Sequence, residues 1–141
     1  MVIVLLVLLL FSVLLEGTVT ALPLVFICLL CLTIVMRDSF IFLPAFIAGI
    51  LLDAFALRPV GEASIFLLLS VFIMLLYQRK YEINSYPFVF IASFIGSFLF
   101  FILFGYSGAF VQAIVSAVIA VLLFALYRLR VKNETSSRYY L

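Results

Sequence analysis

The fold of this chain is decided by residues 46–62, which read FIAGILLDAFALRPVGE. Two apolar stretches meet there at a short turn that contains Pro59 and Gly61, and the first stretch carries a carboxylate, Asp53. An ionisable side chain inside an apolar span is costly in a membrane, so it needs a partner or a position near the membrane edge. Residues 46–62 therefore predict a hairpin of two apolar helices.

The composition around this hairpin is that of an integral membrane protein. Of the 141 residues, 70% are hydrophobic and 10% are charged, whereas a soluble domain carries about 25% charged residues. The chain contains no histidine and no tryptophan. The absence of histidine removes the commonest general base and the commonest metal ligand. The composition therefore argues against an intramembrane enzyme.

Charged and turn residues divide the chain into six apolar runs: 1–15, 21–36, 39–57, 62–77, 87–104 and 109–127. Polar and apolar residues do not alternate along these runs, which argues against a β-barrel. The first run lacks the basic start of a signal peptide and is expected to remain as a helix. The predicted fold is all-α and polytopic, with six transmembrane helices in residues 1–127 and a basic cytoplasmic tail in residues 128–141.

The basic residues predict the orientation of these spans. If the N-terminus is cytoplasmic, only Arg58 of the eight Lys and Arg residues lies outside, and the other seven lie inside: Arg37, Arg79, Lys80, Arg128, Arg130, Lys132 and Arg138. Cytoplasmic loops carry such an excess of positive charge. Both termini are therefore expected in the cytoplasm. Within the tail, residues 131–141 are expected either to lack regular structure or to follow the membrane surface through their basic residues.

Three residues of the third run share one helix face, because Ala45, Gly49 and Asp53 follow one another at intervals of four. Small residues at this spacing allow a second helix to approach closely. Asp53 has three interpretations: it reaches the outer headgroups or pairs with Arg58, it is a buried polar group that holds the turn or a partner, or it relays protons or binds an ion. Glu62 is favourably placed for the dipole of the next helix.

Other candidate groups are better explained by packing. Cys28 and Cys31 have redox spacing, but they lie inside an apolar helix, where cysteine behaves as a small hydrophobe. Small residues on the last two runs predict helix–helix contacts within the chain or with a partner: Ala92, Ser93, Gly96, Ser97, Ala109, Ala113 and Ala117. The nearest approach to a catalytic set is Glu16, Asp53 and Glu62, which lack a base and a metal motif. No catalytic residue is therefore predicted.

The hairpin resembles a family pattern. Gly49, three apolar residues, Asp53, further apolar residues and then Gly61 resemble the motif of the rod-shape-determining membrane proteins called MreD. Pro23 at the start of the second run, the basic stretch at 79–80 and the arginine-rich end at 127–130 are also similar to that family. The resemblance implies six helices in the bacterial cytoplasmic membrane, with a fold similar to the substrate-binding subunits of energy-coupling-factor transporters.

The resemblance also implies a function. MreD-like proteins are non-enzymatic subunits of the cell-elongation machinery, without a cofactor. Their partners are membrane lipid, the scaffold MreC and a peptidoglycan glycosyltransferase–transpeptidase pair, with no nucleic acid. The residues expected to serve structure or interaction are Ala45, Gly49, Asp53, Arg58, Gly61 and Glu62. The alternative is a vitamin-binding subunit of an energy-coupling-factor transporter, which would need a polar pocket near the outer face.

Overall fold

The computed structural model describes residues 2–18, 22–36, 38–81 and 85–138. In these ranges the chain is entirely helical and has no strand, which confirms the predicted all-α class. The elements are α1 (Val2–Thr18), α2 (Leu24–Met36), the short 3-10 helix η1 (Ser39–Ile41), α3 (Phe42–Phe55), α4 (Glu62–Lys80), α5 (Tyr86–Leu103) and α6 (Ala109–Arg138).

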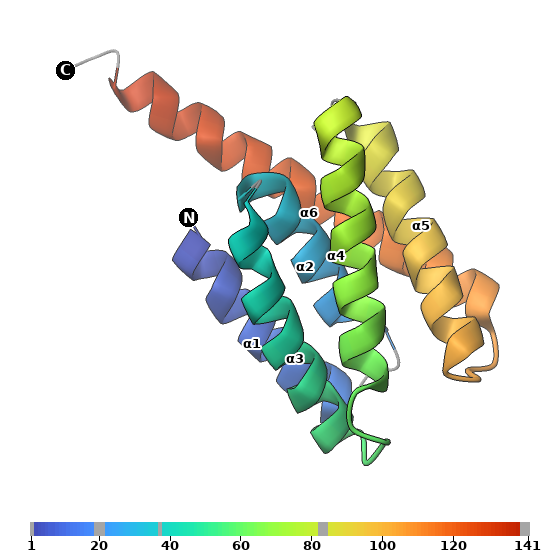
Figure 1. The fold of residues 1–141 in the computed structure, drawn as a ribbon. Helices are drawn as coiled ribbons and strands as arrows, with labels where there is room; N and C mark the ends of the chain where they lie inside the picture. Colours follow the sequence, from blue (N-terminus) through green and yellow to red (C-terminus); the bar gives the residue numbers. More distant parts are fainter. Residues whose placement is uncertain (1, 19–21, 37, 82–84, 139–141) are drawn as a thin grey trace.

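Successive helices alternate in direction (Figure 1). The ends of α1, α3 and α5 and the starts of α2, α4 and α6 gather at one end of the bundle, which we call the turn end. The starts of α1, α3 and α5 and the ends of α2 and α4 lie at the other end, toward which α6 also runs, and we call it the termini end. Arg58 lies in the turn between α3 and α4, whereas Arg79 and Lys80 form the last turn of α4 at the termini end.

Helix α2 forms the centre of the bundle. Every residue from Val25 to Ile34 is buried, and α2 packs against α1, α4, α5 and α6. Its 13 residues span about 20 Å at 1.5 Å per residue, less than the roughly 30 Å of a bilayer core. Cys28 and Cys31 are free and buried in this helix, and Cys28 Sγ lies 3.1 Å from Ser12 Oγ.

Among the described residues, three helices are long and apolar enough to cross a membrane: Glu62–Lys80, Tyr86–Leu103 and Ala109–Glu134. Their outward faces carry large apolar side chains, as Ile65, Leu69, Ile73 and Leu76 do on α4. The other three are apolar but shorter: Ile3–Glu16, Leu24–Met36 and Ser39–Phe55. Transmembrane-helix character is thus supported, and the crossing of the bilayer by all six helices stays a prediction.

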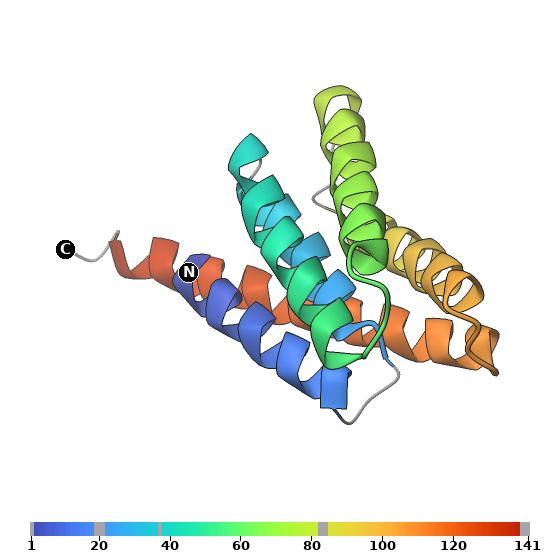
Figure 2. The same ribbon diagram turned by 60° about the horizontal axis from the view of Figure 1, so that its bottom comes forward.

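The end of the chain differs from one of the two forms expected for it. Residues 131–138, for which a lack of regular structure was one expectation, belong to α6, which is a single helix of 30 residues. No Gly or Pro interrupts residues 109–138, and adding one residue to an existing helix is far easier than starting a new one. The last turns of α6 extend beyond the other helices in both views (Figure 1 and Figure 2). The boundary placed at residue 127 therefore falls inside a helix.

Candidate functional site

Helices α3 and α4 meet in backbone contact close to the turn end. A Cβ added to Gly49 would lie 2.4 Å from Cα of Ser64 and 2.7 Å from its backbone nitrogen. Ala45 and Ala48 on α3 and Ala63 on α4 are also buried. The Ser64 Oγ would lie 2.5 Å away as well, but because Cα and N belong to the backbone, moving the Ser64 side chain alone would not make room for a larger residue. The small-residue face predicted from Ala45 and Gly49 is therefore buried, and Gly49 on it contacts α4.

Asp53 continues this face and binds the start of α4. Its side chain is fully buried, and its Oδ2 accepts hydrogen bonds from the backbone N–H of Gly61 at 2.8 Å and of Ala63 at 3.1 Å. The first N–H groups of a helix have no partner inside the helix and usually bind a side chain at the N-cap. Here the N-cap is Gly61, which has no side chain, so Asp53 supplies the acceptor from the preceding helix.

The backbone conformation of Gly61 is one that allows this arrangement. Its φ of +114° lies in the left-handed region, which glycine adopts without steric cost. Glu62 follows in the first turn of α4, where a negative charge favours the helix dipole. The Glu62 side chain is exposed. Its charge therefore favours the start of α4 from the surface, whereas Asp53 binds the same helix start from the buried side.

Arg58 points to a different part of the molecule from Asp53. Its guanidinium carbon lies 4.4 Å from the centre of the Phe104 ring and 5.3 Å from that of Tyr106, and its Nη2 donates a hydrogen bond to the Tyr106 hydroxyl. Arg58 thus joins the α3–α4 turn to the α5–α6 turn. The link to Asp53 runs through the backbone, since the Arg58 N–H donates to the Asp53 carbonyl oxygen at 3.1 Å.

Glu16 on α1 has the same role as Asp53 on α3, since it binds the backbone at the start of the following helix. Its Oε2 accepts a hydrogen bond from the backbone N–H of Val25 at 2.9 Å. Val25 is the second residue of α2, as Ala63 is the second residue of α4. Arg58 is also close enough to Glu16 to interact with it electrostatically. Two successive hairpins, α1–α2 and α3–α4, therefore use a carboxylate of the first helix to cap the second.

The three acids considered as a catalytic set thus have separate roles at the turn end. Glu16 and Asp53 bind the backbone of two different helices, and Glu62 is exposed. Within the ranges that the structure describes, no group of three His, Cys, Asp or Glu residues could hold a metal ion. The role of Glu16 was not found from the sequence, although Glu16 precedes Val25 by nine residues, close to the ten residues between Asp53 and Ala63.

Comparison with known proteins adds no further constraint. No known protein family matches the chain. No curated protein matches it. No solved structure matches it. Function is therefore argued from the residues and their arrangement alone.

Proposed function

We propose that this chain is a non-enzymatic, MreD-like membrane subunit of the bacterial cell-elongation machinery, and that it docks transmembrane helices of its partners. The proposal is supported by one observation above all. Gly49, Asp53 and Gly61, which carry the resemblance to MreD, belong to a single structural unit. Gly49 permits the close helix contact, and Asp53 caps α4 through Gly61 and Ala63. A motif used in this way serves architecture rather than catalysis.

We further propose that all six helices cross the cytoplasmic membrane with both termini in the cytoplasm. The alternating helix directions and the position of Arg79 and Lys80 opposite Arg58 are compatible with this orientation. Helices α1, α2 and α3 are short for a full crossing. They would require a locally thinned bilayer or cover from neighbouring helices, and α2 is already covered on all sides.

The proposed partners are an MreC-like scaffold and a peptidoglycan glycosyltransferase–transpeptidase pair. Without a hydrophobic driving force between helices in lipid, such docking depends on packing and on small residues. The outward apolar faces of α4, α5 and α6 would be available to partner helices or to lipid. Ala45, Gly49, Asp53, Gly61 and Arg58 would support docking indirectly, by holding the α3–α4 hairpin in shape.

The test is purification of the tagged protein from its own cells in a mild detergent, followed by identification of the proteins that accompany it. An MreC-like scaffold is expected. In parallel, depletion of the protein should convert rod-shaped cells to round ones. Recovery of ATPase subunits instead, with normal cell shape on depletion, would overturn the proposal in favour of a vitamin transporter.

The transporter alternative calls for a ligand pocket at the proposed outer face, which is the turn end. Two pockets among the described residues, of about 440 Å³ and 460 Å³, are lined by residues of the termini end. The first lies between α3 and α4, and the second lies between α1 and α6.

A further inference from the structure

The pocket between α3 and α4 arises from the way in which these helices diverge. They are in backbone contact at Gly49 and Ser64, and they move apart toward the termini end (Figure 1 and Figure 2). There the residues between them are large: Phe42 comes from the first turn of α3, and Phe72 and Leu75 come from α4. Small residues at one end and large ones at the other leave a wedge of about 440 Å³.

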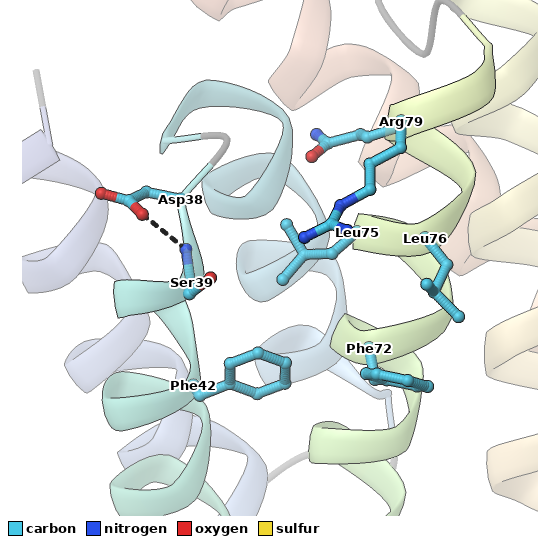
Figure 3. A pocket seen from close by; sticks show the side chains of 8 residues that line it. Asp38, Ser39, Phe42, Phe72, Leu75, Leu76 and Arg79 are labelled. Carbon is cyan, nitrogen blue, oxygen red and sulfur yellow. Dashed lines mark hydrogen bonds between the residues drawn. The ribbon is translucent and has the colours of Figure 1, made fainter.

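The walls of this pocket are apolar and open to the side of the bundle. Phe42 and Phe72 lie on opposite sides of the space, one on each helix (Figure 3). Half of the surface of Phe72 and of Leu76 is exposed. In a protein with membrane-spanning helices, a lateral opening of this kind faces the hydrocarbon chains of the bilayer.

The rim of the pocket carries a cation. Arg79 extends from the last turn of α4 into the space above Leu75 (Figure 3). The nearby Asp38 carboxylate is turned toward its own backbone, where Oδ1 accepts a hydrogen bond from the Ser39 N–H at 2.7 Å. Gln78 is also engaged elsewhere, because its Nε2 donates to the Thr33 carbonyl oxygen of α2 at 3.0 Å. The guanidinium therefore remains directed at whatever enters the pocket.

We propose that this pocket binds an anionic phospholipid, with the headgroup phosphate on Arg79 and an acyl chain between Phe42, Phe72 and Leu76. Arginine binds phosphate through two parallel hydrogen bonds. Arg79 lies at the end of α4, and apolar side chains lie one and two helical turns before it. This arrangement matches a lipid, in which the charged headgroup is followed by the hydrocarbon chains. The proposal depends on the membrane location of the chain, and not on its partners.

The test uses the full chain, purified in detergent and mixed with dioleoylphosphatidylglycerol or with zwitterionic dioleoylphosphatidylcholine. Native mass spectrometry counts the lipid molecules retained. Wild-type protein should retain phosphatidylglycerol in preference to phosphatidylcholine. Arg79→Gln should lower phosphatidylglycerol retention about tenfold, as expected for the loss of a hydrogen-bonded charge pair. Arg79→Lys should retain an intermediate amount.

Lys80→Gln is the matched control, because Lys80 is adjacent to Arg79 and carries the same charge, but its ammonium group lies over the Tyr81 ring at 5.6 Å. This control should change retention less than twofold. Phe42→Ala should weaken retention of phosphatidylglycerol, and glycerol 3-phosphate, which has no acyl chain, should not displace the lipid. Circular dichroism of each variant checks that the helices are intact.

The proposal fails if Arg79→Gln retains as much phosphatidylglycerol as wild type, or if Lys80→Gln loses as much as Arg79→Gln, since the attraction would then be a general property of the basic surface. It also fails if pocket variants abolish the recovery of a partner protein and leave lipid retention unchanged. Because retention is measured on the isolated protein, a positive result would stand even if no elongation partner were found.

Discussion

At Asp53, two substitutions of similar size should have different effects. Asp53→Asn keeps an amide oxygen that can accept hydrogen bonds from Gly61 and Ala63, and hydrogen bonds between membrane helices average about 0.6 kcal/mol. Asp53→Leu leaves the buried Ala63 N–H without an acceptor, at about 1–3 kcal/mol, and removes the acceptor of the half-buried Gly61 N–H as well. We therefore expect a mild loss of stability for Asn and a severe one for Leu, measured by unfolding in mixed detergent.

A functional assay of Asp53→Asn then separates structure from chemistry. If Asp53 serves only to cap α4, this variant should restore rod shape in depleted cells as well as it folds. Loss of function with normal folded yield and normal partner recovery would contradict the structural role. A proton-relay or ligand-binding role for the carboxylate would then take first place.

Gly49 should tolerate no side chain. In Gly49→Leu the new atoms would overlap backbone atoms of Ser64, so α3 and α4 must separate, and overpacking of this kind costs about 1–3 kcal/mol or more. Ala54→Leu adds a bulky side chain to an exposed position of the same helix and is the matched control. The folded yield and thermal stability of Gly49→Leu should fall, whereas those of Ala54→Leu should stay near wild type. Equal yields would mean that the close contact at Gly49 is unimportant.

Relationships between residues of one helix or hairpin could be predicted from the sequence, whereas contacts between residues of different hairpins could not. The four-residue spacing of Ala45, Gly49 and Asp53 is a local property of a helix, so it is readable from the sequence. The hydrogen bond from Arg58 to Tyr106 joins residues 48 positions apart. Nothing in the local pattern around Arg58 indicates which distant aromatic residue its side chain will meet.

At the level of helix pairs, the contact between α2 and α5 should accommodate a larger residue when the facing side chain is made smaller, whereas the α3–α4 contact should not. A Cβ on Gly96 would lie 2.1 Å from Cζ of Phe26, which is the far end of a side chain. Gly96→Ala should therefore destabilise the protein, and Phe26→Leu should relieve part of the effect. A coupling of about 0.5–3 kcal/mol between the two changes is expected in a double-mutant cycle.

The comparison pair for this cycle is Gly49→Ala with Ser64→Gly. Removing the Ser64 side chain leaves its Cα and N in place, 2.4 Å and 2.7 Å from the added Cβ, so little relief is expected. Strong coupling at Gly49, or none at Gly96, would show that the two interfaces are assembled differently from the structure described above.

The start and end of a helix could be predicted where charged or turn residues flank an apolar run. They were harder to predict where polar residues continue the helix. The predicted fourth run began at Glu62, which is where α4 begins. Helix α6 continues past the sixth apolar run, because polar residues at 128–138 indicate exposure rather than the end of a helix. The central position of α2 could not be predicted either. Its sequence is apolar on every side, so no apolar stripe indicates which neighbouring helices pack against it.

For the whole molecule, the proposed orientation predicts opposite labelling of two engineered cysteines. Val60 is exposed in the α3–α4 turn, so Val60→Cys in intact cells should react with a membrane-impermeant maleimide. Ser137→Cys should react only after the membrane is opened. The native Cys28 and Cys31 are buried, so the unmodified protein is the blank. Labelling of both positions from the same side would contradict the six-span arrangement.

Composition alone was sufficient to predict a membrane protein, because 70% hydrophobic residues cannot be covered within a chain of this size, and the lack of alternation along the apolar runs predicted helices. The three-dimensional arrangement needed more. Glu16 belongs to the last turn of α1, Arg58 to the α3–α4 turn and Tyr106 to the α5–α6 turn, yet Arg58 interacts with both of the others at the turn end. That convergence follows from the packing of the helices around α2, which is a property of the assembled bundle.

The placement of Glu16 and Asp53 bears on how the chain is made. In both hairpins the acceptor leaves the ribosome before its donor, since Glu16 precedes Val25 by nine residues and Asp53 precedes Ala63 by ten. Insertion scales give about 2.5–3.5 kcal/mol for a lone carboxylate at the centre of a helix in the bilayer, and a smaller cost applies to Glu16 and Asp53, which lie near the ends of α1 and α3. For a chain that crosses the membrane, α1 and α3 are therefore poorly suited to enter the lipid singly. Each of these helices should wait in the translocation channel for its successor, so that the nascent chain is released two helices at a time.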